Sequence, residues 1–112
     1  MNNNLSIKEN NIAILLCAGK SKRVNDFDKS IIDLNNKPIF FHSIEKLLYS
    51  KKIKKIVIVA SKENNEFIKN YLSSLNLKNI EVILGSTERK YSVKNALTHI
   101  SKYNPKNVII HD

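Results

Sequence analysis

Four cationic side chains gather directly after the first apolar run of this sequence. Ala18 and Gly19 end that run, and within ten residues follow Lys20, Lys22, Arg23 and Lys29. Small residues let backbone N–H groups approach a ligand closely, and cations neutralise phosphate oxygens. The stretch therefore predicts a loop that binds a polyphosphate, although a solvated, lysine-rich loop without a ligand explains the same residues.

The two arginines add a second indication of phosphate binding. Of the 19 lysines and arginines, only Arg23 and Arg89 are arginines. Arginine presents a rigid planar fork that suits phosphate oxygens, and lysine cannot reproduce it. Arg23 lies in the loop after the first apolar run, and Arg89 lies in a second segment that begins at Gly85. Chance placement is the alternative explanation.

Composition limits the classes of protein that the chain can belong to. With 112 residues the chain is long enough for one domain with a real core, for which we expect residues 12–112 after a polar lead-in over 1–11. The net charge of +9 favours an anionic partner. No aromatic residues alternate with the cations, so a nucleic-acid surface built on stacking is poorly supported, whereas a nucleotide or sugar phosphate suits the charge.

The cellular setting also follows from the sequence. Cys17 is the only cysteine, which excludes an intrachain disulfide and is typical of a reducing cytosol. The first residues lack the apolar core of a signal peptide. No apolar run approaches the roughly 20 residues that cross a bilayer. We therefore expect a cytoplasmic protein with no membrane partner.

Strand patterns alternate with helix patterns along the chain. Apolar-rich runs predict strands over 12–17, 56–60, 80–84 and 108–110. Stripes of apolar residues predict helices from Pro38 to near Ser50, from an N-cap at Ser61 through Leu75, and through 93–100. Ser30–Leu34 is expected to be extended, before a turn at Asn35-Asn36. This order indicates parallel βαβ units with right-handed crossovers.

Three polar features follow predicted strands. They are the loop 18–29, the segment 85–92, and His111-Asp112. Ligands of open parallel sheets bind outside the carboxyl ends of the strands, so these features should meet at one edge. Asp112 stands where a strand would lead into a functional loop, and we therefore expect a truncated chain.

Several simpler motifs fail on inspection. Gly19-Lys20-Ser21 resembles the end of a P-loop, but the first glycine of that motif would fall on Ile14, inside a predicted strand. A dinucleotide-binding G-x-G-x-x-G is missing, and no Cys/His cluster has zinc spacing. His42 is expected to be a packed or capping residue, and His99 to favour the dipole at the end of its helix.

The three polar features together resemble the motifs of a known family. The segment Cys17–Val24, with Lys29 beyond it, is similar to A-A-G-x-G-x-R-M followed by a Lys that Pro often precedes. Leu84–Val93 is similar to G-G-x-x-R-x-x-S-V, and His111-Asp112 to an H-D motif. The chain resembles the first half of a 2-C-methyl-D-erythritol 4-phosphate cytidylyltransferase, with ribitol-phosphate cytidylyltransferases as relatives. Among the departures, Ser21 replaces a glycine and Asp28 stands where Pro is common.

The resemblance implies a fold and an activity. The fold would be α/β, a Rossmann-like three-layer sandwich with a mostly parallel sheet, as in nucleotide-diphospho-sugar transferases. The activity would be transfer of CMP from CTP to 2-C-methyl-D-erythritol 4-phosphate, with release of pyrophosphate. By resemblance, Arg23 and Lys29 would be catalytic, and Asp112 would ligate Mg²⁺. The nucleotide would be bound by Ala18, Gly19, Gly85 and Ser92.

The same resemblance leaves alternatives open. A ribitol-5-phosphate cytidylyltransferase would share this half of the sequence, so the polyol phosphate acceptor is undecided. A non-catalytic nucleotide- or RNA-binding domain is the alternative of another class, although no nucleic-acid partner is expected. The full-length form is expected to be a homodimer. This 112-residue piece alone is expected to have little or no transferase activity.

Overall fold

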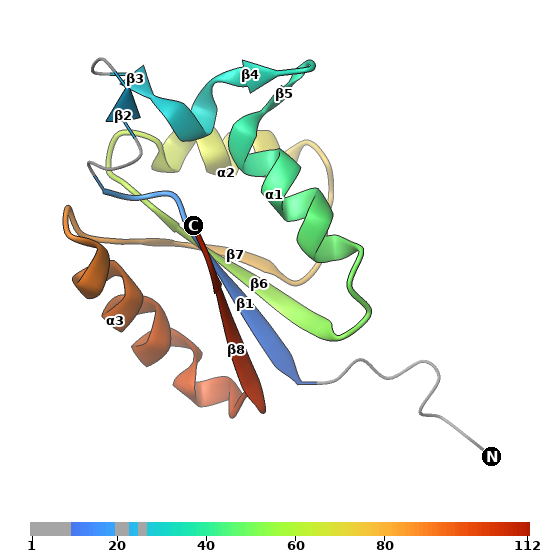
Figure 1. The fold of residues 1–112 in the computed structure, drawn as a ribbon. Helices are drawn as coiled ribbons and strands as arrows, with labels where there is room; N and C mark the ends of the chain where they lie inside the picture. The colour runs from blue at the N-terminus through green and yellow to red at the C-terminus, as the bar shows by residue number, and fades with distance from the viewer. Residues whose placement is uncertain (1–9, 20–22, 25–26) are drawn as a thin grey trace.

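A parallel sheet divides the chain into three layers (Figure 1). The computed structural model describes residues 10–19, 23–24 and 27–112. Within them the main sheet has the order β7 (Ile80–Leu84), β6 (Ile53–Ala60), β1 (Asn11–Leu16) and β8 (Asn107–His111), and every neighbouring pair is parallel. Helices α1 (Ile39–Leu48) and α2 (Asn65–Ser73) cover one face, and α3 (Arg89–Ile100) covers the other. The predicted three-layer α/β fold is confirmed.

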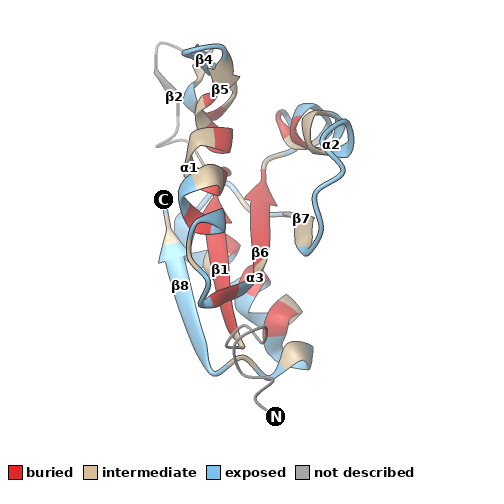
Figure 2. Cartoon of the chain, turned by 90° about the vertical axis from the view of Figure 1, so that its right-hand side faces the viewer, coloured by how far each residue is buried: buried red, intermediate tan, exposed pale blue. Residues whose placement is uncertain are grey.

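The unbroken apolar sequence of β1 follows from burial on both of its faces. Successive side chains of a strand point to opposite faces. Ala13 and Leu15 pack with α1 and α2, whereas Ile12 and Ile14 pack with the Ala96 side of α3. Figure 2 shows β1 and most of β6 as buried along their length. These two strands form the centre of the core and carry the loops that follow them.

Strand β8 lies at one edge of the sheet and is much less buried (Figure 2). Val108 is 36% exposed, and Ile109 and Ile110 are each 41% exposed. Their pairing with β1 runs from Asn11 opposite Asn107 to Leu15 opposite His111. The strand therefore brings Asp112 beside the carboxyl end of β1.

Helix α1 buries an apolar stripe whose spacing the sequence indicates. Phe40, Ile44 and Leu47 are buried at intervals of about one helical turn. The helix begins after Pro38, whose φ of −60° is compatible with a helix start. Phe40 also meets Tyr71 of α2 edge-to-face, with ring centroids 5.6 Å apart. The two helices thus share one aromatic contact layer above the sheet.

The segment after the first loop differs from the prediction. Ser30 does not begin an extended piece, because Lys29–Ile31 forms a short 3₁₀ helix, η3, capped by the Asp28 side chain. The later part of the predicted piece is extended: Ile32 has extended backbone angles, and β4 (Asp33–Leu34) pairs with β5 (Lys37–Pro38). The predicted turn between them is confirmed, since Asn35 and Asn36 have positive φ angles of 52° and 69°. The local hydrogen bond to Asp28 decided the conformation of Ser30.

The predicted cap at Ser61 is wrong in its position. Helix α2 begins at Asn65 with Asn64 as the N-cap residue, and it ends at Ser73, before Leu75. Ser61 lies in the preceding turn, where its Oγ accepts a hydrogen bond from the Asn64 N–H at 3.1 Å. Short polar side chains cap turns as readily as helices, so the residue type alone could not separate the two.

The remaining elements are short. A hairpin of β2 (Arg23–Val24) and β3 (Phe27–Asp28) precedes η3, and a 3₁₀ turn, η4 (Ser101–Tyr103), follows α3. Over the part of the chain that the structure describes, no helix has the length and apolar character required to cross a bilayer.

Candidate functional site

The carboxyl ends of β1, β6 and β7 meet around Gly85. The Gly85 N–H donates a hydrogen bond to the Ala60 carbonyl at 2.8 Å, which continues the pairing of β7 with β6 by one residue. A Cβ atom at Gly85 would lie 2.4 Å from Val59 Cγ1, 2.6 Å from Ser92 Oγ and 3.1 Å from Ala18 Cβ. Only a residue without a side chain allows this approach. Ala18, Gly85 and Ser92, three residues predicted to bind nucleotide, are therefore neighbours.

Ser92 holds the loop between β7 and α3 in shape. It lies in the first turns of α3, and the residue is 1% exposed. Its Oγ accepts a hydrogen bond from the Ser86 N–H at 2.9 Å and donates one to the Ser86 carbonyl at 3.0 Å. The hydroxyl thus serves the loop itself. A contact with a nucleotide base remains a prediction.

The loops after β1 and β7 also touch each other. Gly19 has a φ of +110°, which a residue with a side chain rarely adopts. A Cβ at this position would lie 3.6 Å from the Thr87 carbonyl oxygen, which is an ordinary contact distance. Gly19 is therefore required by its backbone angle, whereas Gly85 is required by the closeness of its neighbours.

Lys29 and Asp112 line one pocket at the same edge of the sheet. The pocket has a volume of about 190 Å³. Its other walls come from the end of β1, from η3 and from α1, and its lining residues are Leu15, Leu16, Cys17, Lys29, Ser30, Ile39, Phe40, Ser43 and Asp112. Lys29, predicted to bind phosphate, and Asp112, predicted to bind the metal, thus line the same pocket.

Asp112 makes a two-pronged ion pair with Arg89. Arg89 Nε and Nη2 each donate a hydrogen bond to a different carboxylate oxygen of Asp112, both at 3.1 Å. The hydrogen bond with Asp112 raises the pKa of Arg89. Both side chains are more than half exposed, so the pair contributes little to stability. The contact instead shows that α3 and the end of β8 meet at this edge.

Of the three other cations in the predicted phosphate loop, only Arg23 is placed, and only in its backbone. Arg23 lies opposite Asp28 in the β2–β3 hairpin, so its backbone is close to the start of η3. The Arg23 side chain lies outside the described part of the structure, as do Lys20 and Lys22. Their approach to a phosphate stays a prediction.

Comparison with known proteins places the chain in a family. The family model described as IspD, 2-C-methyl-D-erythritol 4-phosphate cytidylyltransferase, matches residues 11–112. The chain belongs to this family. The resemblance drawn from the three sequence motifs is thereby confirmed.

The relatives are longer than this IspD-family chain. It is 42% identical over 104 residues to the bifunctional enzyme IspD/IspF of Pelagibacter ubique, covering 92% of this chain and 27% of that protein. It is 37% identical over 102 residues to the 2-C-methyl-D-erythritol 4-phosphate cytidylyltransferase of Dictyoglomus thermophilum, covering 90% and 43%. The chain thus spans less than half of the length of these relatives.

A solved structure supports the same fold. The 4-diphosphocytidyl-2C-methyl-D-erythritol synthase from Anaerococcus prevotii superposes with a TM-score of 0.73 at 24% identity. The match covers 94% of this chain and 43% of the solved one. At this identity the likeness shows the fold.

The metal-binding side chains of this IspD-family chain suit a Mg²⁺ ion that is also coordinated by a substrate phosphate. Among the described residues, no group of three or more His, Cys, Asp or Glu side chains could enclose a metal ion. Mg²⁺ bound through one or two carboxylates completes its shell with water and substrate phosphates. Asp112 provides one carboxylate on the pocket that Lys29 also lines. The residues present therefore fit a metal that arrives with a phosphate.

A second polar cluster of the IspD-family chain lies at the opposite end of the strands. Glu81 of β7 accepts hydrogen bonds from Lys55 at 2.8 Å and Tyr103 at 2.6 Å, and it pairs with His99 at 2.7 Å. Burial favours the neutral acid, but these hydrogen bonds outweigh it and lower the pKa of Glu81 to about 2. His99, expected to favour the dipole at the end of its helix, thus also has Glu81 as a specific partner. The cluster joins β6, β7 and α3.

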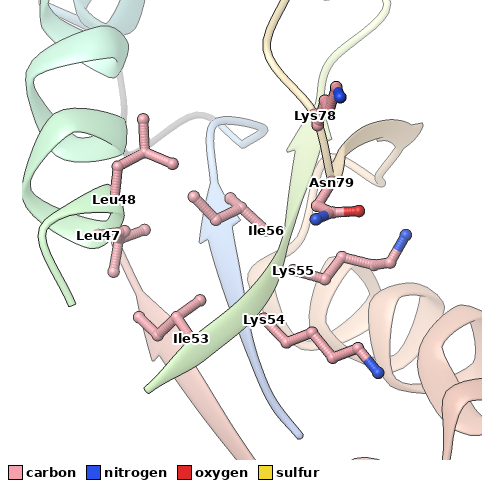
Figure 3. A pocket seen from close by; sticks show the side chains of 8 residues that line it. All are labelled: Leu47, Leu48, Ile53, Lys54, Lys55, Ile56, Lys78 and Asn79. Carbon is pink, nitrogen blue, oxygen red and sulfur yellow. The ribbon is translucent and has the colours of Figure 1, made fainter. Parts of the chain in front are cut away.

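A small pocket lies near that end of the sheet as well (Figure 3). Leu47 and Leu48 of α1 form one wall, and the side chains of Lys54 and Lys55 extend from β6 away from that helix. Its volume is about 30 Å³, enough for a water molecule. The pocket is not a nucleotide site.

Proposed function

We propose that this chain forms the CTP-binding part of an enzyme that transfers CMP to 2-C-methyl-D-erythritol 4-phosphate and releases pyrophosphate. The observation that carries the proposal is the meeting of Gly85 and Ser92 with the Ala18-Gly19 turn, at the edge where Asp112 follows β8. The relative from Dictyoglomus thermophilum is a 2-C-methyl-D-erythritol 4-phosphate cytidylyltransferase, which favours methylerythritol phosphate over ribitol phosphate as the acceptor.

The reaction asks the protein mainly for alignment and charge neutralisation. An oxygen of the acceptor phosphate forms a bond to the α-phosphorus of CTP, and the bond from that phosphorus to the pyrophosphate oxygen breaks. Phosphoryl and nucleotidyl transfers of this kind need no covalent help from side chains. Lys29, exposed beside the pocket, is the described cation best placed to balance the triphosphate charge. Arg23 is proposed to assist it.

The glycines and Ser92 account for binding of the nucleotide itself. Gly19 and Ala18 close the apolar strand β1, so a ligand can approach their backbone without meeting long side chains. Gly85 lies against Ala18, and Ser92 fixes the loop that follows Gly85. We propose that this paired surface holds the cytidine part of CTP.

Mg²⁺ is the proposed cofactor. When bound, the ion would supply positive charge beside the triphosphate, and Asp112 is the residue that would hold it. Arg89 contacts both carboxylate oxygens of Asp112. Each carboxylate oxygen has two lone pairs, so metal binding does not by itself require these contacts to be released.

The rest of the proposed enzyme lies beyond what this chain supplies. The relatives devote more than half of their length to segments that it does not match. We expect the 112-residue chain to bind CTP but to have little transferase activity alone. The cytoplasmic location and the homodimer of the full-length form stay predictions.

Calorimetric titration with CTP and Mg²⁺ tests the proposal. Lys29→Ala and Arg23→Ala should each weaken binding roughly 10- to 100-fold, because a hydrogen bond to a charged group contributes about 1.5–3 kcal/mol. Lys69→Ala removes an equally exposed lysine from α2 and should change nothing. Parent-like affinity in both loop variants would show that the loop does not bind a triphosphate.

The same titration separates the non-catalytic alternative. An RNA-binding domain would bind RNA without CTP, and its affinity would fall steeply with salt concentration. An RNA oligonucleotide is therefore titrated at 50 and 200 mM salt. Weak RNA binding together with measurable CTP binding supports the proposed function.

A further inference from the structure

A buried amide lies directly beneath the candidate site. Asn64 is 0% exposed, although it stands in the turn between β6 and α2. Its Nδ2 donates hydrogen bonds to the Cys17 carbonyl at 2.8 Å and to Asp28 Oδ2 at 2.7 Å. A longer contact of 3.3 Å reaches Ser30 Oγ. No sequence motif pointed to this residue.

The orientation of the amide is fixed by its partners. Asn64 Oδ1 accepts a hydrogen bond from the Ser61 backbone N–H at 2.8 Å. A backbone N–H can only donate and a backbone carbonyl can only accept. The oxygen must therefore face Ser61 and the nitrogen must face Cys17. Both hydrogens of Nδ2 and the oxygen all have partners, so the buried group is fully satisfied.

Asp28 extends the network to Ser30 of η3. Its Oδ1 accepts hydrogen bonds from the Ser30 N–H at 3.0 Å and from Ser30 Oγ at 2.6 Å. These bonds cap η3, which begins with Lys29. Asp28 thus has one carboxylate oxygen on Asn64 and the other on the turn that carries the predicted catalytic lysine.

The network joins the two ends of the predicted phosphate loop. Cys17 immediately precedes Ala18-Gly19, and Asp28 immediately precedes Lys29. Asn64 binds both with one nitrogen atom, from a segment 47 residues after Cys17 and 36 residues after Asp28. Cys17 is held from its other side as well, since its N–H donates to the Val59 carbonyl at 2.8 Å. The Asn64 side chain therefore links the two loop ends directly to each other.

The network also explains a departure noted in the sequence. Asp28 stands where Pro is common before the lysine of the motif. Its φ is −78°, which lies within the range of about −65 ± 15° that a proline ring imposes. Hydrogen bonds to Asn64 and Ser30 hold a backbone angle here that a ring would otherwise hold covalently.

We propose that Asn64, acting through Asp28 and Cys17, is the positioning residue that holds Lys29 in place for the triphosphate of CTP, an inference that rests on the proposed function. Asn64 does not touch the ligand. It keeps the loop ends in their binding arrangement before CTP arrives, so less conformational entropy is lost on binding.

Two variants test the geometry of the network. Asn64→Ala removes the donors to Cys17 and Asp28. Asp28→Asn keeps an acceptor for Ser30 but turns an N–H group toward the N–H group of Asn64. Leu47→Ala is the control, because it truncates a buried side chain at the far end of α1 and destabilises the fold without touching the network.

Two measurements follow in each variant. The first is hydrogen exchange of the Ser30 amide by NMR without nucleotide, and the second is the affinity for CTP and Mg²⁺ by calorimetry. In Asn64→Ala and Asp28→Asn we expect at least tenfold faster exchange and at least fivefold weaker CTP binding. Leu47→Ala should leave the CTP affinity within twofold of the parent. Parent-like CTP affinity in Asn64→Ala, or equal losses in Asn64→Ala and Leu47→Ala, would overturn the proposal.

A double variant checks that the two side chains act as a pair. Asn64→Asp alone places two carboxylates against each other, and adding Asp28→Asn supplies a donor again. The double variant should therefore bind CTP more tightly than Asn64→Asp alone, and strictly additive losses would contradict the pairing. If the parent binds no CTP, the proposed function has failed and the positioning role for CTP fails with it. The exchange rate of the Ser30 amide would then show whether the network itself exists.

Discussion

Gly85→Ala is the substitution whose effect the structure specifies most closely. The added Cβ would lie 2.4 Å from Val59 Cγ1 and 2.6 Å from Ser92 Oγ, whereas ordinary contacts begin at 3.4 Å. Val59 is fully buried in β6, a strand paired on both sides, so it cannot move without disturbing the sheet. Overpacking of this kind costs about 1–3 kcal/mol. We expect the upper end of this range, with a fall in Tm of roughly 10 °C.

Urea unfolding followed by far-ultraviolet circular dichroism measures this cost. The set comprises the parent, Gly85→Ala, Val59→Ala and the double variant. Val59→Ala removes the closest atom, so the double variant should be more stable than the sum of the single effects predicts, with a coupling of about 1 kcal/mol or more. The close approach of β7 to β6 is wrong as described if Gly85→Ala is as stable as the parent.

Gly19→Ala serves as the matched control. Its Cβ would meet the Thr87 carbonyl oxygen at an acceptable 3.6 Å, but the φ of +110° would be strained. The expected loss is about 1–2 kcal/mol and comes from the backbone alone. Adding Val59→Ala should not reduce the stability loss caused by Gly19→Ala. Rescue of Gly19→Ala by Val59→Ala would refute the distinction between the two glycines.

Two further predictions concern single side chains. Ser92→Ala removes both hydrogen bonds to Ser86, and urea unfolding should show a loss of about 1–3 kcal/mol; a loss below about 0.5 kcal/mol would contradict it. The lowered pKa of Glu81 means that its ionised form stabilises the fold above about pH 4.5, and that this stability is lost as the pH falls from 4.5 toward 2. In Glu81→Gln, the free energy of unfolding should therefore fall less between pH 4.5 and 2 than in the parent, by on the order of 1–2 kcal/mol after reduction for solvent screening. A fall as steep as the parent's would refute the assignment.

Much of the fold was predictable because its signals are local. The apolar runs Ile12–Cys17 and Ile56–Ala60 favoured strands buried on both faces, and they fall in the two central strands, β1 and β6. Asn35-Asn36 specified a hairpin turn through backbone preference alone. The carboxyl-edge rule for parallel sheets then brought Gly85 and Asp112 to the same side as Gly19.

Other features could not be predicted, and most of them depend on partners distant in sequence. Asn64 reads as a surface turn residue, and only the fold brings it under Cys17 and Asp28. Ser61 offered a good cap, but which backbone N–H it would meet depended on where α2 begins. Glu81 likewise carried no signal, because its three partners come from β6, α3 and η4. Side-chain hydrogen bonds across 18 or more residues leave no periodic trace in a sequence.

The pairing of β1 with β8 has a consequence for how the chain is made. Asn11 pairs with Asn107, so β1 must wait until the segment around residue 107 is synthesised before both of its edges are covered. At roughly 5–20 residues per second, translation leaves that edge of β1 open for several seconds or more. Bringing β1 and β8 together closes a long loop, which also slows folding, since the conformational entropy of that loop is lost before the contacts between the strands form. An early nascent chain therefore displays an apolar strand without its neighbour, the situation in which chaperones act.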